Sequence, residues 1–273
     1  MLTLKEKGQK FLALHQRERA FIIPNPWDAG TAKLLALLGF EALATTSAGF
    51  AFSIGVPDGA VGREAMMAHI AAIASATDLP VSADLENGFG DDAGTVAQTI
   101  RLAAAAGLAG GSIEDVSPRP EGRLYELSHA ADRVHAAAEA ASALPFTFTL
   151  TARAENHIVG HPDLKDTIRR LQAYQEAGAD VLYAPGLRTK EDIAEVVKSV
   201  DRPVNVIMGL QGVRLTLGEL SAIGVKRVSV GSALSRAALG EFLRAAGEMH
   251  DRGSFEFAEK AVTYREVNEM FGS

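Results

Sequence analysis

Residues 177–185, which read AGADVLYAP, mark a passage from a helix into a strand. The preceding residues 164–177 have apolar positions at helical spacing, and a glycine just past the end of a helix is its usual left-handed cap. The run that follows Gly178 is rich in residues that favour strands. This stretch therefore predicts a helix that ends near residue 177 and a strand that begins a few residues later.

The same passage recurs along the chain in two forms. Glycine introduces the strand-like runs ALATT (42–46), AGGSIED (109–115) and KRVSV (226–230), and proline introduces VSAD (81–84), TFTLTAR (147–153) and NVIM (205–208). Counting the run 21–24 as the first, the sequence predicts eight strands separated by segments with helical apolar spacing. Strict alternation favours a parallel sheet, and eight units favour closure. We therefore expect an α/β fold, a single (β/α)8 TIM barrel.

The composition limits the possible partners. The chain has 273 residues, 47% of them hydrophobic, so residues 1–273 are expected to form one domain around one core. The formal net charge of -7 argues against nucleic acid or an anionic membrane as a partner. The chain has no cysteine, which excludes disulfides and thiolate catalysis, and it has neither a signal-peptide core nor an apolar run of ~20 residues. These features favour a soluble, cytoplasmic protein.

The segment 252–273 follows the helix predicted for residues 233–249 and has the pattern of an extra amphipathic helix. Its apolar residues are Phe255, Phe257, Val262, Tyr264, Val267 and Met270. Such a face needs a surface to cover, either on its own barrel or on a partner subunit. We expect a C-terminal helical extension that packs on a partner subunit.

Acidic residues gather where strands are predicted to end, which is the edge that carries the active site in barrels of this class. Asp84 and Glu86 lie two positions apart after the third strand and so point to the same face, Glu114 ends the fourth strand, and Asp58 follows the second. Carboxylates that converge in a dry pocket raise one another's pKa, and a hard divalent cation removes that conflict. We expect these four residues to hold Mg²⁺, or Mn²⁺ in its place. The alternative is that they cap the helices that follow.

Arg153 ends the fifth predicted strand, beside this acidic group. Its forked guanidinium suits a two-bond grip on a substrate carboxylate. The alternative is a structural salt bridge to Glu114 or Glu155. In contrast, no lysine lies at a predicted strand end, so a Schiff-base aldolase would lack its nucleophile.

Small residues follow the second predicted strand. The backbone N–H groups of Thr46, Ser47 and Ala48 can approach a ligand oxygen closely, although a tight turn would use the same residues. Asn205 on the seventh strand is a further candidate for substrate contact, with a structural hydrogen bond as the alternative.

Jointly, these motifs resemble those of the isocitrate lyase/phosphoenolpyruvate mutase superfamily, over residues 24 to about 247. The motifs are PNPWDAGTAKLL, ALATTSAGFAFSIGVPDG, DLENGFG, SIEDV, TARAEN, ADVLYAPG and GVKRVSVGSAL. The resemblance implies that the four carboxylates hold Mg²⁺ directly or through water, that residues 46–48 line the substrate pocket, and that Arg153 grips the carboxylate or enolate end. Metal and backbone N–H groups would then stabilise a developing enolate. It also implies a homo-oligomer, a dimer or a tetramer.

The chain departs from the superfamily pattern after the fourth strand. Isocitrate and methylisocitrate lyases carry a Lys-Lys/Arg-Cys-Gly-His run there, whereas this chain has VSPRPEGRLY (116–125), so those two activities are not expected. We expect this loop to be a mobile lid in which Arg119, Arg123 and Tyr125 read a second carboxylate or donate a proton. Glu86 stands where Asp is usual. The sixth strand ends without the His or Glu of some members, which argues against a mutase.

The sequence thus predicts a Mg²⁺-dependent carbon–carbon lyase that acts on a small 2-oxo or 2-hydroxy (di)carboxylate through an enolate. Catalytic roles are expected for Arg153, Glu114, Asp58 and Tyr125. The two specific lyase reactions that we consider are oxaloacetate decarboxylation and a malate-like retro-aldol cleavage. The alternatives are P–C bond chemistry on phosphonopyruvate, as a hydrolase or a mutase, and a barrel that only binds. Retention of the four carboxylates and Arg153 argues against the last.

Overall fold

Eight short parallel strands form a nearly closed barrel in the order β1-β8-β7-β6-β5-β4-β3-β2. The computed structural model describes residues 2–117, 123–210 and 212–272. The strands are β1 Phe21–Ile23, β2 Leu43–Ala44, β3 Val81–Asp84, β4 Gly110–Glu114, β5 Thr149–Arg153, β6 Val181–Tyr183, β7 Val204–Ile207 and β8 Arg227–Ser229. At the seam, the amide of Ala44 donates to the carbonyl of Pro24 at 3.0 Å. The predicted (β/α)8 barrel is confirmed.

Helices surround the sheet and connect its strands. They are α1 Leu4–His15, α2 Ala29–Leu37, α3 Ser47–Ser53, α4 Arg63–Ser75, α5 Ala93–Ala105, α6 Leu127–Ser142, α7 Leu164–Glu176, α8 Lys190–Lys198, α9 Leu217–Ala222 and α10 Ala233–Arg252. Side chains cap several of their first turns; Asp163, for example, accepts from the amides of Lys165 and Asp166 at the start of α7. Gly178 ends that helix at φ 104°, as the sequence predicts. Within the described residues, no helix has the length and apolar composition needed to cross a bilayer.

The main hydrophobic core lies between the sheet and the helices. Ile70, Ile100, Leu171 and Ile193 are fully buried there, and burial of each such side chain stabilises the fold by about 1.5–3 kcal/mol. The shell of helices therefore holds the strand ends, which carry the polar residues, in fixed positions.

Two helices were not predicted from the sequence. Helix α1 begins with a capping box in which the Thr3 side chain and Glu6 satisfy each other's backbone amides. Helix α3 begins at Ser47, and Thr46, expected in a small-residue stretch that binds ligand, is its N-cap and accepts from the amide of Gly49.

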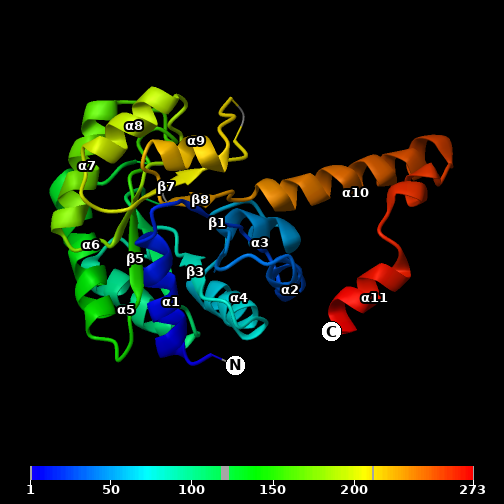
Figure 1. Cartoon of the computed structure of the whole chain (residues 1–273), viewed down its shortest axis with the longest axis horizontal. Coiled ribbons are helices and arrows are strands. Elements are labelled where there is room, and N and C mark those ends of the chain that lie inside the picture. Colours follow the sequence, from blue (N-terminus) through cyan, green and yellow to red (C-terminus); the bar gives the residue numbers. More distant parts are fainter. Residues whose placement is uncertain (1, 118–122, 211, 273) are drawn as a thin grey trace.

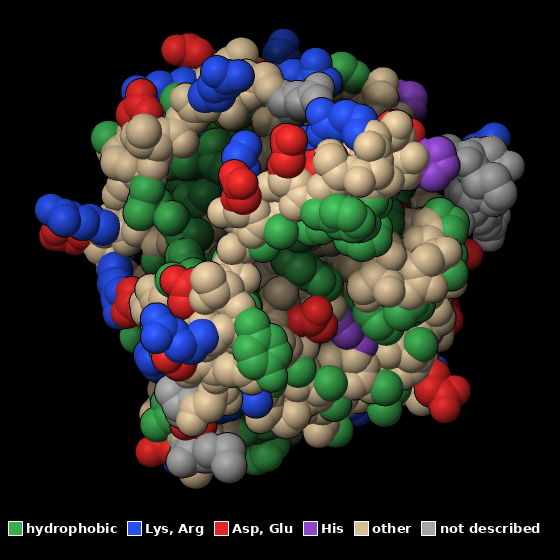
Figure 2. All heavy atoms as spheres, turned by 90° about the vertical axis from the view of Figure 1, so that its right-hand side faces the viewer, with side chains coloured by type: hydrophobic (Ala, Val, Ile, Leu, Met, Phe, Trp, Pro, Cys, Tyr) green, Lys and Arg blue, Asp and Glu red, His purple; other side chains and the backbone are tan. Residues whose placement is uncertain are grey.

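The C-terminal part of the chain leaves the barrel (Figure 1). Helix α10 projects outward as an arm in which only Ser235 and Glu248 are buried, followed by the 3-10 helix η1, Glu256–Lys260, and by α11, Tyr264–Gly272. Helix α11 turns back to contact α2, where the Phe271 ring lies beside Gly30. Large apolar side chains of this C-terminal part are exposed: Phe242 (66%) and Leu243 (66%) on the arm, Phe255 (67%) just before η1 and Tyr264 (87%) at the start of α11. Hydrophobic side chains also reach the surface in patches on the face from which the arm projects (Figure 2).

We expect the arm to be covered by another copy of the chain. Sedimentation equilibrium at micromolar concentration should show a dimer or a tetramer, because exposed aromatic residues on an otherwise unpacked helix are stabilised when a partner buries them. Replacing Phe242 and Leu243 together by Glu should shift the mass to that of a monomer, whereas Leu102→Glu on α5 should not. A monomeric wild-type protein would overturn this expectation.

A buried histidine closes the amino-terminal end of the barrel. His15 is 2% exposed, its ring meets those of Phe11 and Phe21 edge-on, and its Nδ1 lies 2.8 Å from the carbonyl oxygen of Phe11. Burial lowers the pKa of His15 to about 3, and the nearby Arg227 adds to the effect. The imidazole is therefore neutral at neutral pH.

This histidine predicts an acid-sensitive fold. Because its folded-state pKa lies below the ordinary value of about 6.5, the stability it contributes is present above pH ~6.5 and is lost as the pH falls toward 3. Between pH 7 and pH 5 the loss should be about 2 kcal/mol. Urea unfolding of wild type and His15→Leu at both pH values measures it, with His250→Leu, at a side chain 88% exposed, as control. An equal pH dependence in wild type and His15→Leu would contradict the prediction.

Candidate active site

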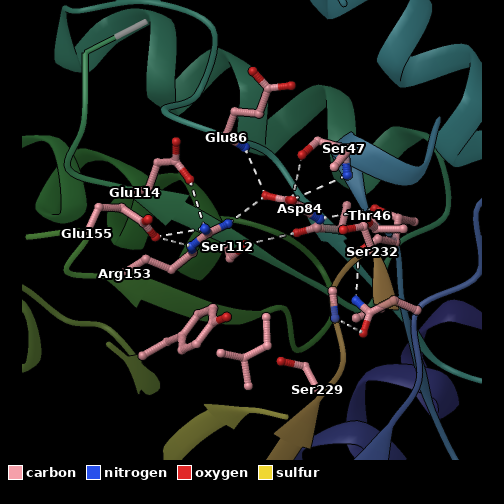
Figure 3. Close-up of a pocket in the computed structure, with 18 of the residues that line it drawn as sticks. Thr46, Ser47, Asp84, Glu86, Ser112, Glu114, Arg153, Glu155, Ser229 and Ser232 are labelled. Carbon is pink, nitrogen blue, oxygen red and sulfur yellow. Dashed lines mark hydrogen bonds and ion pairs between the residues drawn. The ribbon is translucent and has the colours of Figure 1, made fainter. Parts of the chain in front are cut away.

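A cavity of about 450 Å³ opens at the carboxyl ends of the strands and continues down into the barrel (Figure 3). The predicted site residues that line it are Thr46, Ser47, Ala48, Asp58, Asp84, Glu86, Glu114, Arg153 and Asn205. The alternation of β3, β4 and β5 turns their last residues inward, so side chains far apart in sequence meet here.

Arg153 lies at the centre of the acidic group. Its Nη1 is 2.8 Å from Asp84 Oδ1, and its Nη2 is 3.2 Å from Glu114 Oε2 and 2.7 Å from Glu155 Oε1 (Figure 3). Burial would lower the pKa of Arg153, but the charges of Glu155, Glu114 and Asp84 outweigh it and raise that pKa well above its ordinary value. The salt bridges considered for this arginine from the sequence are thus present, and they fix the plane of its guanidinium at the cavity wall.

Asp84 is held from two sides. Ser47 donates to its Oδ2 from the backbone amide at 3.3 Å and from the hydroxyl at 2.8 Å, and the amide of Glu86 lies 3.4 Å from its Oδ1. The chain then turns sharply, with Glu86 at φ 50° and Phe89 at φ 61°, a left-handed conformation that is uncommon for residues other than glycine. Such backbone strain is typical of functional sites.

The carboxylates around Arg153 carry more negative charge than one guanidinium balances. Burial and the charges of Asp84 and Asp58 raise the pKa of Glu86 to about 8, and burial raises the pKa of Glu114 well above its ordinary value against the effect of Arg153. At the cavity mouth, desolvation and Asp84 also raise the pKa of Asp58, whose Oδ1 accepts from the Ser47 hydroxyl at 3.3 Å. Without a further cation, this group keeps protons that it would otherwise release.

A divalent cation fits this donor set. Glu86 Oε1 is buried and has no hydrogen-bond partner among the described residues. The possible metal ligands around it are carboxylate oxygen atoms, which are hard ligands. Within the described chain, no three His, Asp or Glu side chains are already arranged as a closed ligand set. Mg²⁺ keeps several waters and takes only one or two protein carboxylates directly, so a preformed cage is not required. The fit is therefore to a hydrated Mg²⁺ near Glu86 and Asp84.

A second arginine supports the site from behind. Arg133 on α6 is 1% exposed and, among the described residues, donates to the backbone carbonyls of Asp91 (3.1 Å), Glu114 (3.2 Å), Gly90 (2.9 Å) and Asn87. Three of these carbonyls belong to the loop after β3 and one to the last residue of β4, so one side chain ties the loop that carries Glu86 to the strand end that carries Glu114.

The comparison with known proteins agrees with this geometry. The family model for phosphoenolpyruvate phosphomutase matches residues 11–250. The chain belongs to the phosphoenolpyruvate mutase/isocitrate lyase superfamily. An uncharacterised protein from Mycobacterium tuberculosis is 31% identical over 258 residues, 94% of each chain. The 2,3-dimethylmalate lyase of Eubacterium barkeri is 29% identical and covers 79% of this chain and 76% of its own.

Solved structures of the superfamily match closely. A Burkholderia cenocepacia protein described as a lyase or mutase has a TM-score of 0.97 at 61% identity, covering 99% of this chain and 98% of its own. Phosphonopyruvate hydrolase in complex with oxalate and Mg²⁺ has a TM-score of 0.87 at 26% identity, covering 99% and 95%.

Tyr125 does not reach the cavity, contrary to the role expected for it. Its hydroxyl donates to Asp91 Oδ1 at 2.6 Å and accepts from Asn87 Nδ2 at 3.0 Å, and Arg133 lies over its ring at 4.2 Å. Because these contacts hold the side chain on the α6 side of the loop, we do not retain Tyr125 as a catalytic candidate.

The predicted lid is only partly described. Arg119 lies outside the described residues. Arg123 is exposed and lines a separate groove with residues 160–163, not the cavity. Its carbonyl accepts from the amide of Ser117, and Val116 pairs with Leu124 in an antiparallel bridge. The base of the loop is therefore a narrow hairpin.

Two lining residues have contacts that the sequence did not predict. Asn25 donates to the carbonyl of Thr45 and accepts from the amides of Val230 and Gly231, so it joins β1, β2 and β8 at the seam. Arg227 lies at the cavity floor. Nothing in its local sequence, KRVSV, distinguished it from a surface residue.

Proposed function

We propose that this protein is a Mg²⁺-dependent lyase that cleaves a C–C bond of a small 2-oxo or 2-hydroxy dicarboxylate through an enolate. One observation carries the proposal: Arg153 lies among more carboxylates than it can neutralise, at the strand ends of a superfamily barrel, with Glu86 Oε1 buried and unpartnered. This arrangement suits a divalent cation and an anionic substrate together.

The chain's own residues would divide the work. Arg153, held in place by Glu155, would offer its charge and its remaining N–H groups to the substrate carboxylate. Ser47, hydrogen-bonded to both Asp84 and Asp58, would keep these two carboxylates oriented toward the cavity. When bound, the divalent cation would supply positive charge beside the carbonyl oxygen, where negative charge develops as the bond breaks.

Apolar groups complete the cavity mouth. Val116, Ile158 and Val159 line it, and such groups exclude water from a carbanion-like leaving group that stray protons would quench. The named relatives support a lyase, because 2,3-dimethylmalate lyase and the 2-methylisocitrate lyase of Salmonella typhimurium (30% identical over 209 residues) both belong to that class. Methylisocitrate lyases carry a cysteine in the loop after the fourth strand, and this chain has no cysteine. We therefore do not propose 2-methylisocitrate lyase activity for it.

A substrate panel tests the proposal. The protein with Mg²⁺ is incubated with oxaloacetate, malate, 2-methyl-substituted malates and phosphonopyruvate, and release of pyruvate or glyoxylate is followed. We expect turnover of a 2-oxo or 2-hydroxy dicarboxylate. Turnover of phosphonopyruvate alone would instead establish P–C chemistry, to which phosphonopyruvate hydrolase is the structural parallel. Turnover of none would favour a binding barrel.

Activity should depend on the divalent cation. Excess EDTA should abolish turnover, and Mg²⁺ or Mn²⁺ should restore it, because the carboxylates of Asp84, Glu114 and Glu155 share one guanidinium and Glu86 Oε1 is buried without a partner among the described residues. Asp84→Asn should lower kcat/KM roughly 10²- to 10³-fold at saturating Mg²⁺, with exposed Asp132→Asn as control. Full turnover in EDTA, with no metal found by elemental analysis, would disprove the dependence.

A further inference from the structure

The cavity contains a second arginine, Arg227, below Arg153. Arg153, Tyr183, Asn205 and Arg227 are register partners on β5, β6, β7 and β8, so their side chains form one inward row around the barrel. Arg153 is the last residue of its strand and Arg227 the first of its own, so the row descends from the carboxyl end to the floor. All four line the same cavity.

Arg227 has neutral partners only, within the part of the chain that the structure describes. Its Nε donates to Asn205 Oδ1 at 2.8 Å, and its Nη1 lies 3.5 Å from Nε2 of His15, which is neutral at neutral pH. Asn205 in turn donates to the Ser229 hydroxyl at 3.0 Å. Burial lowers the pKa of Arg227 to about 10, so the guanidinium remains charged at neutral pH although it is only 5% exposed.

A buried charge without an opposite charge is costly, and proteins normally pair it. Arg153 satisfies this rule with three carboxylates, whereas Arg227 does not. The hydroxyls of Thr149 and Thr151, on the inward side of β5 with Arg153, are also buried and have no partner among the described residues. The barrel interior, which is filled with branched apolar side chains in most such folds, therefore offers unused donors and one unpaired cation.

We propose that Arg227, with Asn205 and Ser229, is the floor subsite for the second carboxylate of the substrate. The inference rests on the proposed function and deepens it: the substrate is a dicarboxylate whose reacting end lies at Arg153 and whose other carboxylate reaches down the row to Arg227. A cavity of about 450 Å³ has room for such a small molecule.

Binding of unreactive anions to the protein in EDTA tests the floor subsite separately from turnover. Calorimetry compares succinate and malonate with acetate, at constant ionic strength, for wild type, Arg227→Met, Arg227→Lys and the control Arg101→Met on the exposed face of α5. We expect Arg227→Met to weaken binding of the better dicarboxylate roughly 30- to 100-fold and to leave acetate binding unchanged. Arg227→Lys should lose less dicarboxylate affinity than Arg227→Met, because lysine keeps the positive charge.

Equal dicarboxylate affinity in wild type and Arg227→Met would overturn the proposal. A second outcome would also overturn it: chloride stabilises wild type but not Arg227→Met, and succinate adds no further stability. The floor would then hold an adventitious ion only. If Arg227→Met does not fold, Asn205→Leu is the second variant, and it should show the same selective loss. If the dicarboxylate binds through Arg227 but no panel substrate turns over, the proposed function fails while the subsite stands.

Discussion

Arg153→Met should lower kcat/KM on the best panel substrate roughly 10²- to 10⁴-fold, the largest loss of activity that we expect from one substitution. The change removes the forked donor proposed to bind the substrate carboxylate, and with it the cation that contacts Asp84, Glu114 and Glu155. Breaking a buried ion pair from one side costs about 3–5 kcal/mol. Steady-state kinetics at saturating Mg²⁺ measure the effect, and Arg153→Lys, which keeps charge but not the fork, should recover only part of it.

Unfolding at different pH values shows whether Arg153→Met loses activity because the guanidinium is gone or because the protein is unfolded. Without Arg153, the folded-state pKa values of Glu114 and Glu155 should rise further above their unfolded values. The stability from holding these protons is present below pH ~4.3 and is lost as the pH rises. Arg153→Met should therefore unfold more easily at pH 8 than at pH 5 relative to wild type. Wild-type kcat/KM in a folded Arg153→Met protein would exclude the proposed role.

Arg133→Met should lower the stability of the fold by about 3–5 kcal/mol, or the Tm by roughly 6–20 °C. The variant leaves three carbonyl groups of the loop after β3 and one at the end of β4 without their charged donor, in a place that is almost closed to water. Thermal unfolding measures the loss. Arg101→Met on the exposed face of α5 should stay within about 0.5 kcal/mol of wild type.

Mg²⁺ binding distinguishes a positioning role for Arg133 from a purely structural one. If Arg133 orients the loops that carry Glu86 and Glu114, Mg²⁺ affinity in folded Arg133→Lys should fall roughly 10- to 100-fold, as for other residues that support metal ligands. Unchanged Mg²⁺ affinity in that variant would limit Arg133 to a structural role.

The fold could be predicted because its signals are local. Gly178 and the proline before β7 each mark a helix-to-strand passage within a few residues, so even strands as short as β2 could be located. Helix α3 was missed for the same reason: its seven residues, with Thr46 as cap, have the composition of a tight turn. The C-terminal extension was predicted as one helix, whereas the structure divides it into η1 and α11.

Most of the predicted residues that line the cavity lie at strand ends or in the segments that follow them; Asn205, inside β7, is the exception. Asp84, Glu114 and Arg153 end strands, and the cavity brings them together. Arg133 lies 46 positions from Asn87, and its role follows from how α6 packs, which no local pattern encodes. Tyr125 was placed in the lid by its loop, but contacts with Asn87, Asp91 and Arg133 hold it elsewhere.

The departure of α10 from its own barrel links folding to concentration. If a second chain covers the arm, as we expect, apolar surface that one chain leaves in water is buried only on association. Mass action then enters the unfolding equilibrium, and each tenfold dilution should lower the apparent free energy of unfolding by about 1.4 kcal/mol per mole of dimer. The same molecule would then melt at a lower temperature in a dilute assay than in a concentrated stock.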